Sequence, residues 1–332
     1  MSKTLYTSCF GCFVFDASFK LAEKIDFKEV VRVNSQLEKC EWSDEELALI
    51  AKHNPEFFLG FKVSKRAGIK VTQDPKKLQA VRDYFKGDIA QFAQTNTLIT
   101  KQKLKNAVGE DLLIIQCINS IQDINRSISR LAKRLREWYS FYNPEFGEKI
   151  DDHEAFIRLI LEKSRKELLD EIKVKESESM GADLEKKDVE PMLLIAQNLR
   201  ELYALKQSEE SYLEKMMNAN CPNIEAVAGA LIGARLMAIA GSLERLAIIP
   251  SSTLQLLGAE KALFRHLTKK SLPPKYGILH EHPLISKAKH KDHGKVARAL
   301  ADKISLAAKV DYFKGEFVGD RLKAELEKRF GK

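Results

Sequence analysis

The feature that most constrains this fold is a near-heptad series of apolar residues over positions 113–142. Its members follow one another at steps of three or four residues, the spacing of a coiled-coil seam, and polar residues fill the other faces. One long helix is predicted from about Val108 to Asn143, because Pro144 disfavours helical geometry in the residue before it. The seam residues are Leu113, Cys117, Ile121, Ile124, Ile128, Leu131, Leu135, Trp138 and Tyr142.

A helix of this length needs a second surface to cover its seam. About 35 residues of helix span ~50 Å, which exceeds what one partner in a compact domain can cover. A second apolar series, from Pro191 to about Asn218, can return antiparallel to the first. The arm is therefore interpreted either as an intramolecular hairpin or as a surface that also pairs two copies. For pairing between copies the candidate residues are Ile121, Ile124, Ile128, Leu131, Leu135 and Trp138.

Two further features lie between the long helices. A shorter amphipathic helix is predicted over Phe156–Ile172, where apolar residues recur at helical spacing. The polar stretch Lys173–Asp188 that follows is expected to be a mobile loop. With these included, the predicted arm covers residues 108–222.

Residues 1–107 mix strand and helix signals and predict a small α/β domain. Strands are expected at Leu5–Phe15, Ile25–Val33 and Phe57–Val63, which are short aromatic or β-branched runs. Ser43 and Glu46 have the spacing of a capping box, so a helix is predicted to begin there. Asp74 followed by proline at the first helical position predicts another. The aromatic residues of this domain could form a docking patch, although strand alternation predicts that at least half of them are buried: Phe10, Phe13, Phe15, Phe57, Phe58 and Phe61.

Residues 223–332 predict a compact all-α domain. Asn223 is expected to cap its first helix, and alanines and glycines crowd residues 226–241. Because glycine disfavours a helix by ~1 kcal/mol relative to alanine, their presence predicts a very close approach between helices. A later helix, from about Gly294 to Tyr312, is expected to bury Val296, Leu300 and Ile304.

The net positive charge of the chain lies entirely in its last third. Residues 225–332 hold 20 Lys+Arg against 11 Asp+Glu, whereas residues 1–224 hold 35 against 36. A localised basic surface beside a neutral remainder is typical of a module that binds a polyanion and is joined to parts with another role. A lysine-rich solvated surface is the alternative interpretation.

The densest part of this basic region is residues 251–275. Gly258 allows a tight break before a helix on which Lys261 and Arg265 share one face, so that both can reach adjacent phosphates. Leu263, Phe264 and Leu267 are expected to anchor the other side of that helix. The loop 269–277 is stiffened by two prolines and presents Lys269, Lys270 and Lys275.

No catalytic or metal-binding signature is strong. The glycine-rich dinucleotide and phosphate loops and the Gly-x-Ser-x-Gly elbow are missing from the sequence. Core packing is favoured over zinc or redox use for the lone pair Cys9 and Cys12. A phosphate-contacting loop is favoured over a metal site for the histidines at positions 280, 282, 290 and 293. The five cysteines without framework spacing, and the lack of a signal peptide or long apolar run, suggest a soluble protein of a reducing compartment.

Four segments of the last third strongly resemble the Nop domain. They are Gly229–Leu236, Ala240–Ala247, Pro250–Leu267 and Pro273–Gly277, and the Leu254–Leu267 part is nearly gap-free as a family signature. The whole-chain order looks like the archaeal core protein of box C/D small ribonucleoproteins, in the Nop56/Nop58-like family. Ser251 departs mildly from the family's usual alanine, and the long Lys/Glu tail of eukaryotic relatives does not appear before Lys332.

The resemblance implies a scaffold and not an enzyme. In this family the N-terminal domain binds fibrillarin, the methyltransferase that carries S-adenosylmethionine, and the scaffold itself needs no cofactor. The coiled coil pairs two copies, and the Nop domain recognises a kink-turn RNA with its ribosomal-protein-like binder. Carried over by position, the family's Gly-Ala-Glu-Lys element is Gly258, Ala259, Glu260 and Lys261. The RNA and protein interface is expected to comprise these and Arg265, His266, Lys269, Lys270, Lys275, Lys291, Lys295 and Arg298.

The leading functional expectation is a bridge that allows guided RNA 2′-O-methylation, in rRNA or tRNA, with catalysis in the partner. A spliceosomal-type Nop protein is the runner-up, against which the N-terminal α/β domain argues, because that relative lacks one. An RNA-modifying enzyme in its own right is a third possibility. No membrane association is expected, and the location is expected to be cytoplasmic for an archaeal-type member or nucleolar for a eukaryotic one.

Overall fold

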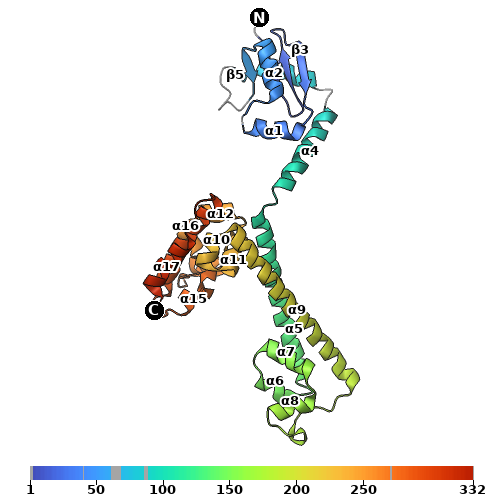
Figure 1. Cartoon of the computed structure of the whole chain (residues 1–332), viewed down its shortest axis with the longest axis vertical. Helices are drawn as coiled ribbons and strands as arrows, with labels where there is room; N and C mark the ends of the chain where they lie inside the picture. Colours follow the sequence, from blue (N-terminus) through green and yellow to red (C-terminus); the bar gives the residue numbers. More distant parts are fainter. Residues whose placement is uncertain (1–2, 40, 61–68, 86–88, 270, 332) are drawn as a thin grey trace. The chain divides into compact units, whose positions relative to one another are not determined.

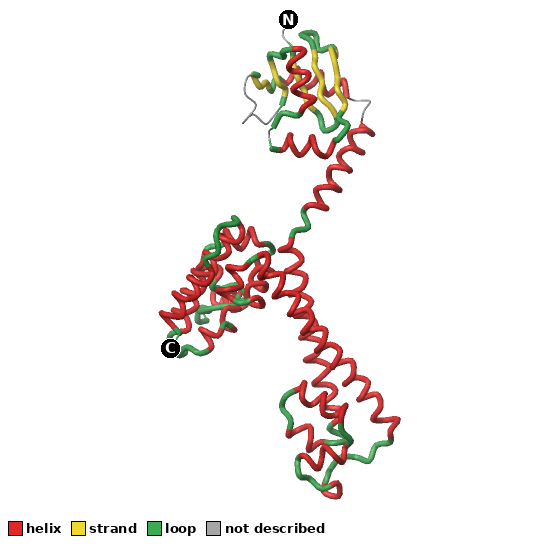
Figure 2. Tube along the Cα trace, viewed as in Figure 1, coloured by secondary structure: helices red, strands yellow, loops and turns green. Residues whose placement is uncertain are grey.

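The structure is a computed structural model that describes the chain apart from residues 1–2, 40, 61–68, 86–88, 270 and 332. It forms two compact units, Met1–Val108 and Gly109–Lys332 (Figure 1). Among the described residues, strands occur only in the first unit, and helices make up nearly all of the second (Figure 2). The predicted class, a mostly helical multidomain protein with a small α/β domain at its N-terminus, is confirmed.

The first unit is built on a five-stranded mixed sheet of order β3-β2-β1-β4-β5. Strands β1 and β2 pair antiparallel, as do β2 and β3, whereas β4 is parallel to β1 and β5 is parallel to β4. The bounds of the strands are Thr4–Thr7 for β1, Gly11–Phe15 for β2, Leu21–Asp26 for β3, Phe57–Leu59 for β4 and Lys70–Thr72 for β5.

The observed strands are shorter than the predicted ones, because turns and bends interrupt the predicted runs. The run Leu5–Phe15 is a hairpin, because the Ser8 hydroxyl accepts the amides of Phe10 and Gly11 and turns the chain there. The prediction for Ile25–Val33 was wrong beyond Asp26, because helix α1 (Val30–Glu38) begins after a short bend. Of the run predicted to end at Val63, residues 61–63 lie outside the described residues.

Helices cover both faces of this sheet. Val33 of α1 and Leu49 of α2 (Asp44–His53) pack on one face, and Val81 of α3 (Pro75–Tyr84) packs on the other. The predicted caps are confirmed: Ser43 and Glu46 form a capping box, and the Asp74 side chain accepts the Lys76 amide. The long helix α4 (Ile89–Asn106), which contacts α1, was not predicted.

The aromatic docking patch is not available on this sheet. All five residues of β2 are buried, since both faces of that central strand are covered. Phe57 is half-buried and Phe61 lies outside the described residues. The remaining four, Phe10, Phe13, Phe15 and Phe58, are core residues with exposed fractions of 6% or less.

The second unit begins with the predicted arm. Helices α5 (Glu110–Tyr139) and α9 (Lys186–Asn220) pack against each other along their length. Ile121, Ile128 and Leu135 are buried in this hairpin, Ile124 and Trp138 are half-buried, and Leu131 is exposed. The intramolecular hairpin is thus confirmed, and pairing with a second copy stays a prediction.

The arm ends in a small helical cluster. It consists of α6 (Pro144–Lys149), α7 (His153–Glu162), α8 (Arg165–Glu171) and a short 3₁₀ turn, Glu176–Glu178. The single helix predicted over 156–172 is broken at Ser164, which forms a second capping box with Glu167. The stretch that follows is irregular up to Glu185 apart from this turn, as predicted, and its mobility stays a prediction. The Arg165 guanidinium donates to the Gly181 carbonyl at 2.9 Å and stacks over Tyr142.

The rest of the second unit is the predicted all-α domain. Gly233 of α11 marks a close approach between helices, since an added Cβ would lie 2.6 Å from Ile224 Cγ2 and 2.9 Å from Met217 Cε. The helices are α10 (Pro222–Ala228), α11 (Ala230–Ala240), α12 (Leu243–Ile248), α13 (Ser251–Leu254), α14 (Glu260–Lys269), α15 (Pro283–Ser286), α16 (His293–Tyr312) and α17 (Gly319–Phe330), with a 3₁₀ turn at Ile278–Glu281.

Two expectations for this domain had different outcomes. The helix predicted over 294–312 is confirmed as α16, which buries Val296, Leu300 and Ile304. The expected N-cap at Asn223 was wrong, because Cys221 occupies the cap and Asn223 is buried inside α10. Within the described residues, no single helix is long and apolar enough to cross a membrane. Helices α10 and α11, which are bent by 115° relative to each other, together have the length and composition of a broken span.

Candidate ribonucleoprotein interface

A left-handed glycine sets the geometry of the candidate interface. Gly258 has φ +85°, and an added Cβ would lie 2.4 Å from Ile278 Cγ2, so neither its conformation nor its surroundings admit a side chain. Its amide donates to Glu260 Oε1 at 2.7 Å, which ties the turn to the first residue of α14. The break predicted at Gly258 is confirmed.

The end of the proline loop packs directly against this turn. The Gly277 amide donates to the Gln255 carbonyl at 2.9 Å, and the Ile278 amide donates to the Leu257 carbonyl at 2.9 Å. The Gln255 side chain in turn donates to the Lys275 carbonyl at 2.6 Å. These bonds fix Lys275 relative to Gly258, although the two residues are far apart in sequence.

Helix α14 leaves this turn without burying any of its ten residues. Lys261 and Arg265 are exposed, and Arg265 Nε donates to the Lys261 carbonyl one turn earlier. The expected anchoring side was wrong: Phe264 is 67% exposed and Leu267 is 72% exposed, and only Leu263 is half-buried. The helix therefore presents a basic face and an apolar face to its surroundings together.

The other predicted residues fall into two groups. Ala259 and Glu260 lie in or beside the Gly258 turn, His266 bonds to the Ser271 carbonyl, Lys269 is exposed at the end of α14, and Lys270 lies outside the described residues. Lys275 lies against Gly294, at the first turn of α16. The structure thereby brings the proline loop to the helix that carries the remaining members, the exposed residues Lys295 and Arg298, with Lys291 just before it.

All four histidines have partners within the protein: His280 and His290 pack against other rings, and His282 and His293 form hydrogen bonds. His293 Nε2 donates to the Ala288 carbonyl at 3.0 Å, and its Nδ1 lies 3.3 Å from the Tyr276 hydroxyl. The Tyr276 ring stacks on His280. Within the part of the chain that the structure describes, no group of three His, Cys, Asp or Glu side chains is placed to hold a metal ion.

Of the cysteine pair near the N-terminus, Cys12 lies in β2 and Cys9 lies in the turn before that strand. Cys12 is buried, and burial raises the pKa of its thiol to about 12. Burial also raises the pKa of Cys9, which is half-buried. Thiols shifted in this direction are poor nucleophiles at neutral pH, which agrees with the packing role preferred from the sequence.

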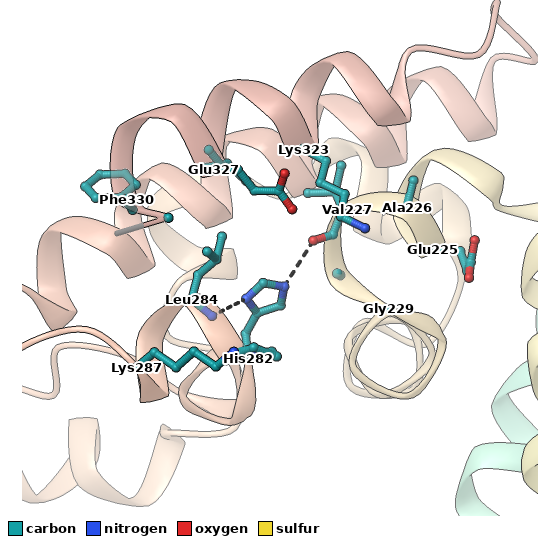
Figure 3. Close-up of a pocket in the computed structure, with 14 residues that line it drawn as sticks. Glu225, Ala226, Val227, Gly229, His282, Leu284, Lys287, Lys323, Glu327 and Phe330 are labelled. Carbon is teal, nitrogen blue, oxygen red and sulfur yellow. Dashed lines mark hydrogen bonds between the residues drawn. The ribbon is translucent and has the colours of Figure 1, made fainter.

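A separate hollow of about 710 Å³ lies between α10, α15 and α17 (Figure 3). His282 lies at its base, where Nε2 donates to the Val227 carbonyl at 3.2 Å and Nδ1 accepts the Leu284 amide at 3.2 Å. Burial lowers the pKa of this imidazole, and the nearby Lys323 adds to the effect. None of the residues predicted for the interface lines this hollow.

The basic turn and helix at Gly258 lie within a region that matches a protein-family model. The model, described as Nop, snoRNA binding domain, fibrillarin, matches residues 120–332. The chain belongs to the Nop family. The match covers most of the arm and the whole C-terminal domain, which is here called the Nop domain, and it makes that domain an RNA-binding module.

Individual relatives show the same similarity. An uncharacterized NOP5 family protein of Methanocaldococcus jannaschii is 40% identical over 249 residues, covering 70% of this chain and 60% of that protein. Nucleolar protein 58 of Aspergillus niger is 33% identical over 321 residues, covering 88% of this chain and 55% of that protein. The chain thus spans a little over half the length of these relatives. A crystal structure of a fibrillarin/Nop5p complex aligns over 98% of both chains with 22% identity and a TM-score of 0.44.

Sequence reasoning missed one property of the Nop domain. Large apolar side chains near the predicted basic residues are exposed, including Phe264, Leu267 and Leu272, the last at 92%. Helical periodicity alone suggested a buried side for α14, because it does not reveal whether another element is present to cover it. The high hydrophobic content of a helix rich in lysine and arginine was the available signal.

Proposed function

We propose that this protein is a non-catalytic scaffold of a box C/D guide ribonucleoprotein that supports RNA 2′-O-methylation by a bound methyltransferase. The Nop domain recognises a kink-turn RNA together with its small protein binder, and the first unit carries a fibrillarin-type enzyme. The scaffold itself holds no cofactor, since S-adenosylmethionine belongs to the partner.

The observation that carries this proposal is that α14 exposes both basic and apolar side chains. Lys261 and Arg265 offer charge to phosphates, while Phe264 and Leu267 on the same helix offer exposed apolar area. RNA alone accounts for the cations, because phosphate contacts dominate its affinity. An exposed apolar side next to them is what a protein partner requires, so the helix suits a surface composed of RNA and protein.

Charge distribution supports the division of labour. Residues 225–332 hold the net positive charge and residues 1–224 are close to neutral. Within residues 1–224 the first unit, residues 1–108, holds 18 Lys+Arg against 13 Asp+Glu, and residues 109–224 hold 17 against 23. The largest positive excess is therefore in residues 225–332, which favours that part of the chain as the nucleic-acid module. The location expected from this assignment is the cytoplasm for an archaeal-type protein and the nucleolus for a eukaryotic one.

Self-association through the arm is part of the proposal. A groove of about 600 Å³ on the outer side of the hairpin is lined by Leu131, Ile195, Leu202 and Leu205. Leu131 belongs to the heptad series yet is 39% exposed, so the intramolecular partner leaves part of the seam uncovered. A second copy that contributes the same groove would bury these residues.

Reconstitution tests the scaffold role. Guide RNA, kink-turn binder, methyltransferase and this chain are combined, and methylation of a matched target RNA is measured with each component omitted in turn. Guided methylation is expected only in the complete mixture. Unchanged methylation without this chain would refute the proposal, and saturable S-adenosylmethionine binding by the isolated chain would favour an RNA-modifying enzyme instead.

A variant pair tests the interface. Lys261→Ala with Arg265→Ala is expected to weaken assembly on the RNA and to flatten its salt dependence, because two phosphate contacts are lost. Methyltransferase binding should be retained. Phe264→Ala is expected to weaken assembly without changing the salt dependence, because it removes apolar contact with the protein part of the surface.

A further inference from the structure

Basic and apolar side chains lie in a row along the outer face of α16. Lys295, Arg298, Leu306 and Lys309 recur at helical spacing on the side opposite the buried residues of that helix, and Phe313 follows at its C-cap. From Lys295 to Phe313 this face runs ~27 Å. Its first two members belong to the candidate interface described above, and the rest extend away from it.

A groove accompanies the far half of this face. It has a volume of about 780 Å³, and its lining includes Ile248, Leu306, Lys309 and Arg329. Ile248 is 70% exposed and Leu306 is 47% exposed, although both are large aliphatic side chains. Lys303 also lines the groove, but its ammonium group is paired with Glu325. Among the described residues, Lys309 and Arg329 have no carboxylate within ion-pair distance.

Two aromatic rings stand at the end of the face. Phe313 is 71% exposed and Phe317 is 54% exposed. Phe313 packs edge-on against Tyr312 with ring centroids 4.9 Å apart, and the Phe317 ring lies against Gly319 at the start of α17. Their loop is held in place because the Val318 amide donates to the buried side chain of Asn223 at 2.7 Å.

We propose that this face and its groove, called the α16 track, bind a single-stranded segment of RNA that continues from the kink-turn surface. The inference rests on the proposed function for the identity of the RNA. Lys295 is paired with Asp292, whereas Arg298 and Lys309 of α16 and Arg329 of α17 have no carboxylate within ion-pair distance among the described residues, so these three can offer charge to phosphates. The exposed rings at the end offer stacking surfaces to bases. Aliphatic side chains between them contact sugar and base faces.

The track also contains an element that opposes RNA binding. Asp302 lies on the same face, between Arg298 and Lys309, and lines the groove. Its negative charge is expected to limit the affinity of the track. Asp302→Lys should therefore tighten binding, which gives a gain of function that loss of folding cannot imitate.

The first experiment uses the full-length protein and an oligouridylate of about twelve nucleotides as the probe. Binding is measured across a range of salt concentrations. Lys309→Ala with Arg329→Ala should lower the magnitude of the salt slope by about 1.4, since each phosphate contact on a single strand contributes about 0.7. Phe313→Ala with Phe317→Ala should weaken binding about tenfold and leave the slope unchanged, because stacking releases no counterions.

The matched control is Lys323→Ala with Lys328→Ala. These two exposed lysines of α17 lie outside the groove, so the slope should be unaffected. An equal change of the salt slope in the control would refute the α16 track, because the slope would then depend on the overall charge of the protein and not on the position of the cations. So would unchanged binding in both sets of track variants, or failure of Asp302→Lys to tighten it.

The second experiment locates the RNA in the assembled particle. Guide RNA substituted with 4-thiouridine is assembled with the kink-turn binder and this chain, and is then cross-linked and mapped to peptides. Cross-links are expected within residues 299–317. If cross-linking instead attaches the binder or the methyltransferase to these peptides, the track is a protein surface and the proposal is wrong.

Failure of the track and failure of the proposed function give different results. If Lys261→Ala with Arg265→Ala weakens assembly while every track variant behaves as wild type, only the track is refuted. If the track variants weaken oligouridylate binding while assembly on kink-turn RNA is insensitive to Lys261 and Arg265, the track stands and the assignment of the main interface falls.

Discussion

The buried carboxylate of Asp311 accepts a hydrogen bond from Asn223 Nδ2 at 2.7 Å, across 88 residues of sequence. The same carboxylate accepts the backbone amides of Asn223 at 3.1 Å and Ile224 at 2.8 Å. A side chain of α16 therefore accepts the hydrogen bonds of the free backbone amides in the first turn of α10. This pair joins the arm's end to the core of the Nop domain.

Asp311→Asn is expected to destabilise this junction by about 3 kcal/mol, because the NH2 group that replaces one carboxylate oxygen donates hydrogen bonds and would face at least one backbone N–H donor in either orientation. Hydrogen exchange measured on the full chain should accelerate at the Asn223 and Ile224 amides. Asp302→Asn, an exposed change in the same helix, is the control and should leave those amides protected. Equal protection in both variants would show that the carboxylate does not hold α10.

Acidification should weaken the region around His282. Burial lowers the pKa of this imidazole below its ordinary value of 6.5 in the folded protein. As pH falls below 6.5, the unfolded chain takes up a proton that the folded one resists, so stability decreases until the folded pKa is reached. Above 6.5 both states are neutral and the contribution is constant.

His282→Gln isolates this effect. The decrease in thermal midpoint between about pH 8 and pH 5.5 should be smaller in the variant than in the wild type. Burial also lowers the pKa of His153, which titrates in the same direction, so some dependence should persist. If the variant and the wild type lose stability equally, His282 is not responsible.

Gly258→Ala should impair the interface through backbone strain. The left-handed conformation and the contact with Ile278 both oppose a Cβ, and a cost of ~1–3 kcal/mol is expected. The affinity for RNA in the assembly should fall by more than the loss of global stability alone would cause, because the turn sets the orientation of α14. Gly147→Ala is the matched control: a Cβ there meets nothing within 4 Å, so stability should be unchanged or slightly higher.

Substitutions at two aliphatic residues of α5, Ile128 and Leu131, should distinguish the stability of the hairpin from pairing between copies. Ile128 is 5% exposed, and Ile128→Ala is expected to destabilise the hairpin by about 2–5 kcal/mol. Leu131→Asp should leave the hairpin folded and abolish pairing of copies. Light scattering gives the mass of each variant in solution, and an unchanged mass for Leu131→Asp would refute pairing through the groove.

The arm and the Nop helices could be predicted because their signals are local or periodic. The series from Leu113 to Tyr142 defines one face of a helix without reference to anything else, and Ser43 caps a helix with a residue three positions away. Helix α16 was predictable for the same reason.

The errors arose where distant residues decide the outcome. Asn223 is of a residue type that often caps helices, but Cys221 is the N-cap of α10, and the Asp311 carboxylate accepts the hydrogen bonds of the first helical amides and of the buried Asn223 side chain. The helical spacing of Phe264 predicts a core residue, whereas its side chain is 67% exposed among the residues that the structure describes. The strand predicted through Val33 failed because the bend after Asp26 depends on packing of α1 against the sheet.

The exposure of α14 has a practical consequence for anyone handling this protein. A short helix that buries no side chain depends on its own weak propensity, so it should open often in the isolated chain. Trypsin would then cleave after Lys261 and Arg265 before it reaches the stable helices around them. Resistance to cleavage at those two bonds would show, without labels or activity assays, that α14 is covered by bound partners.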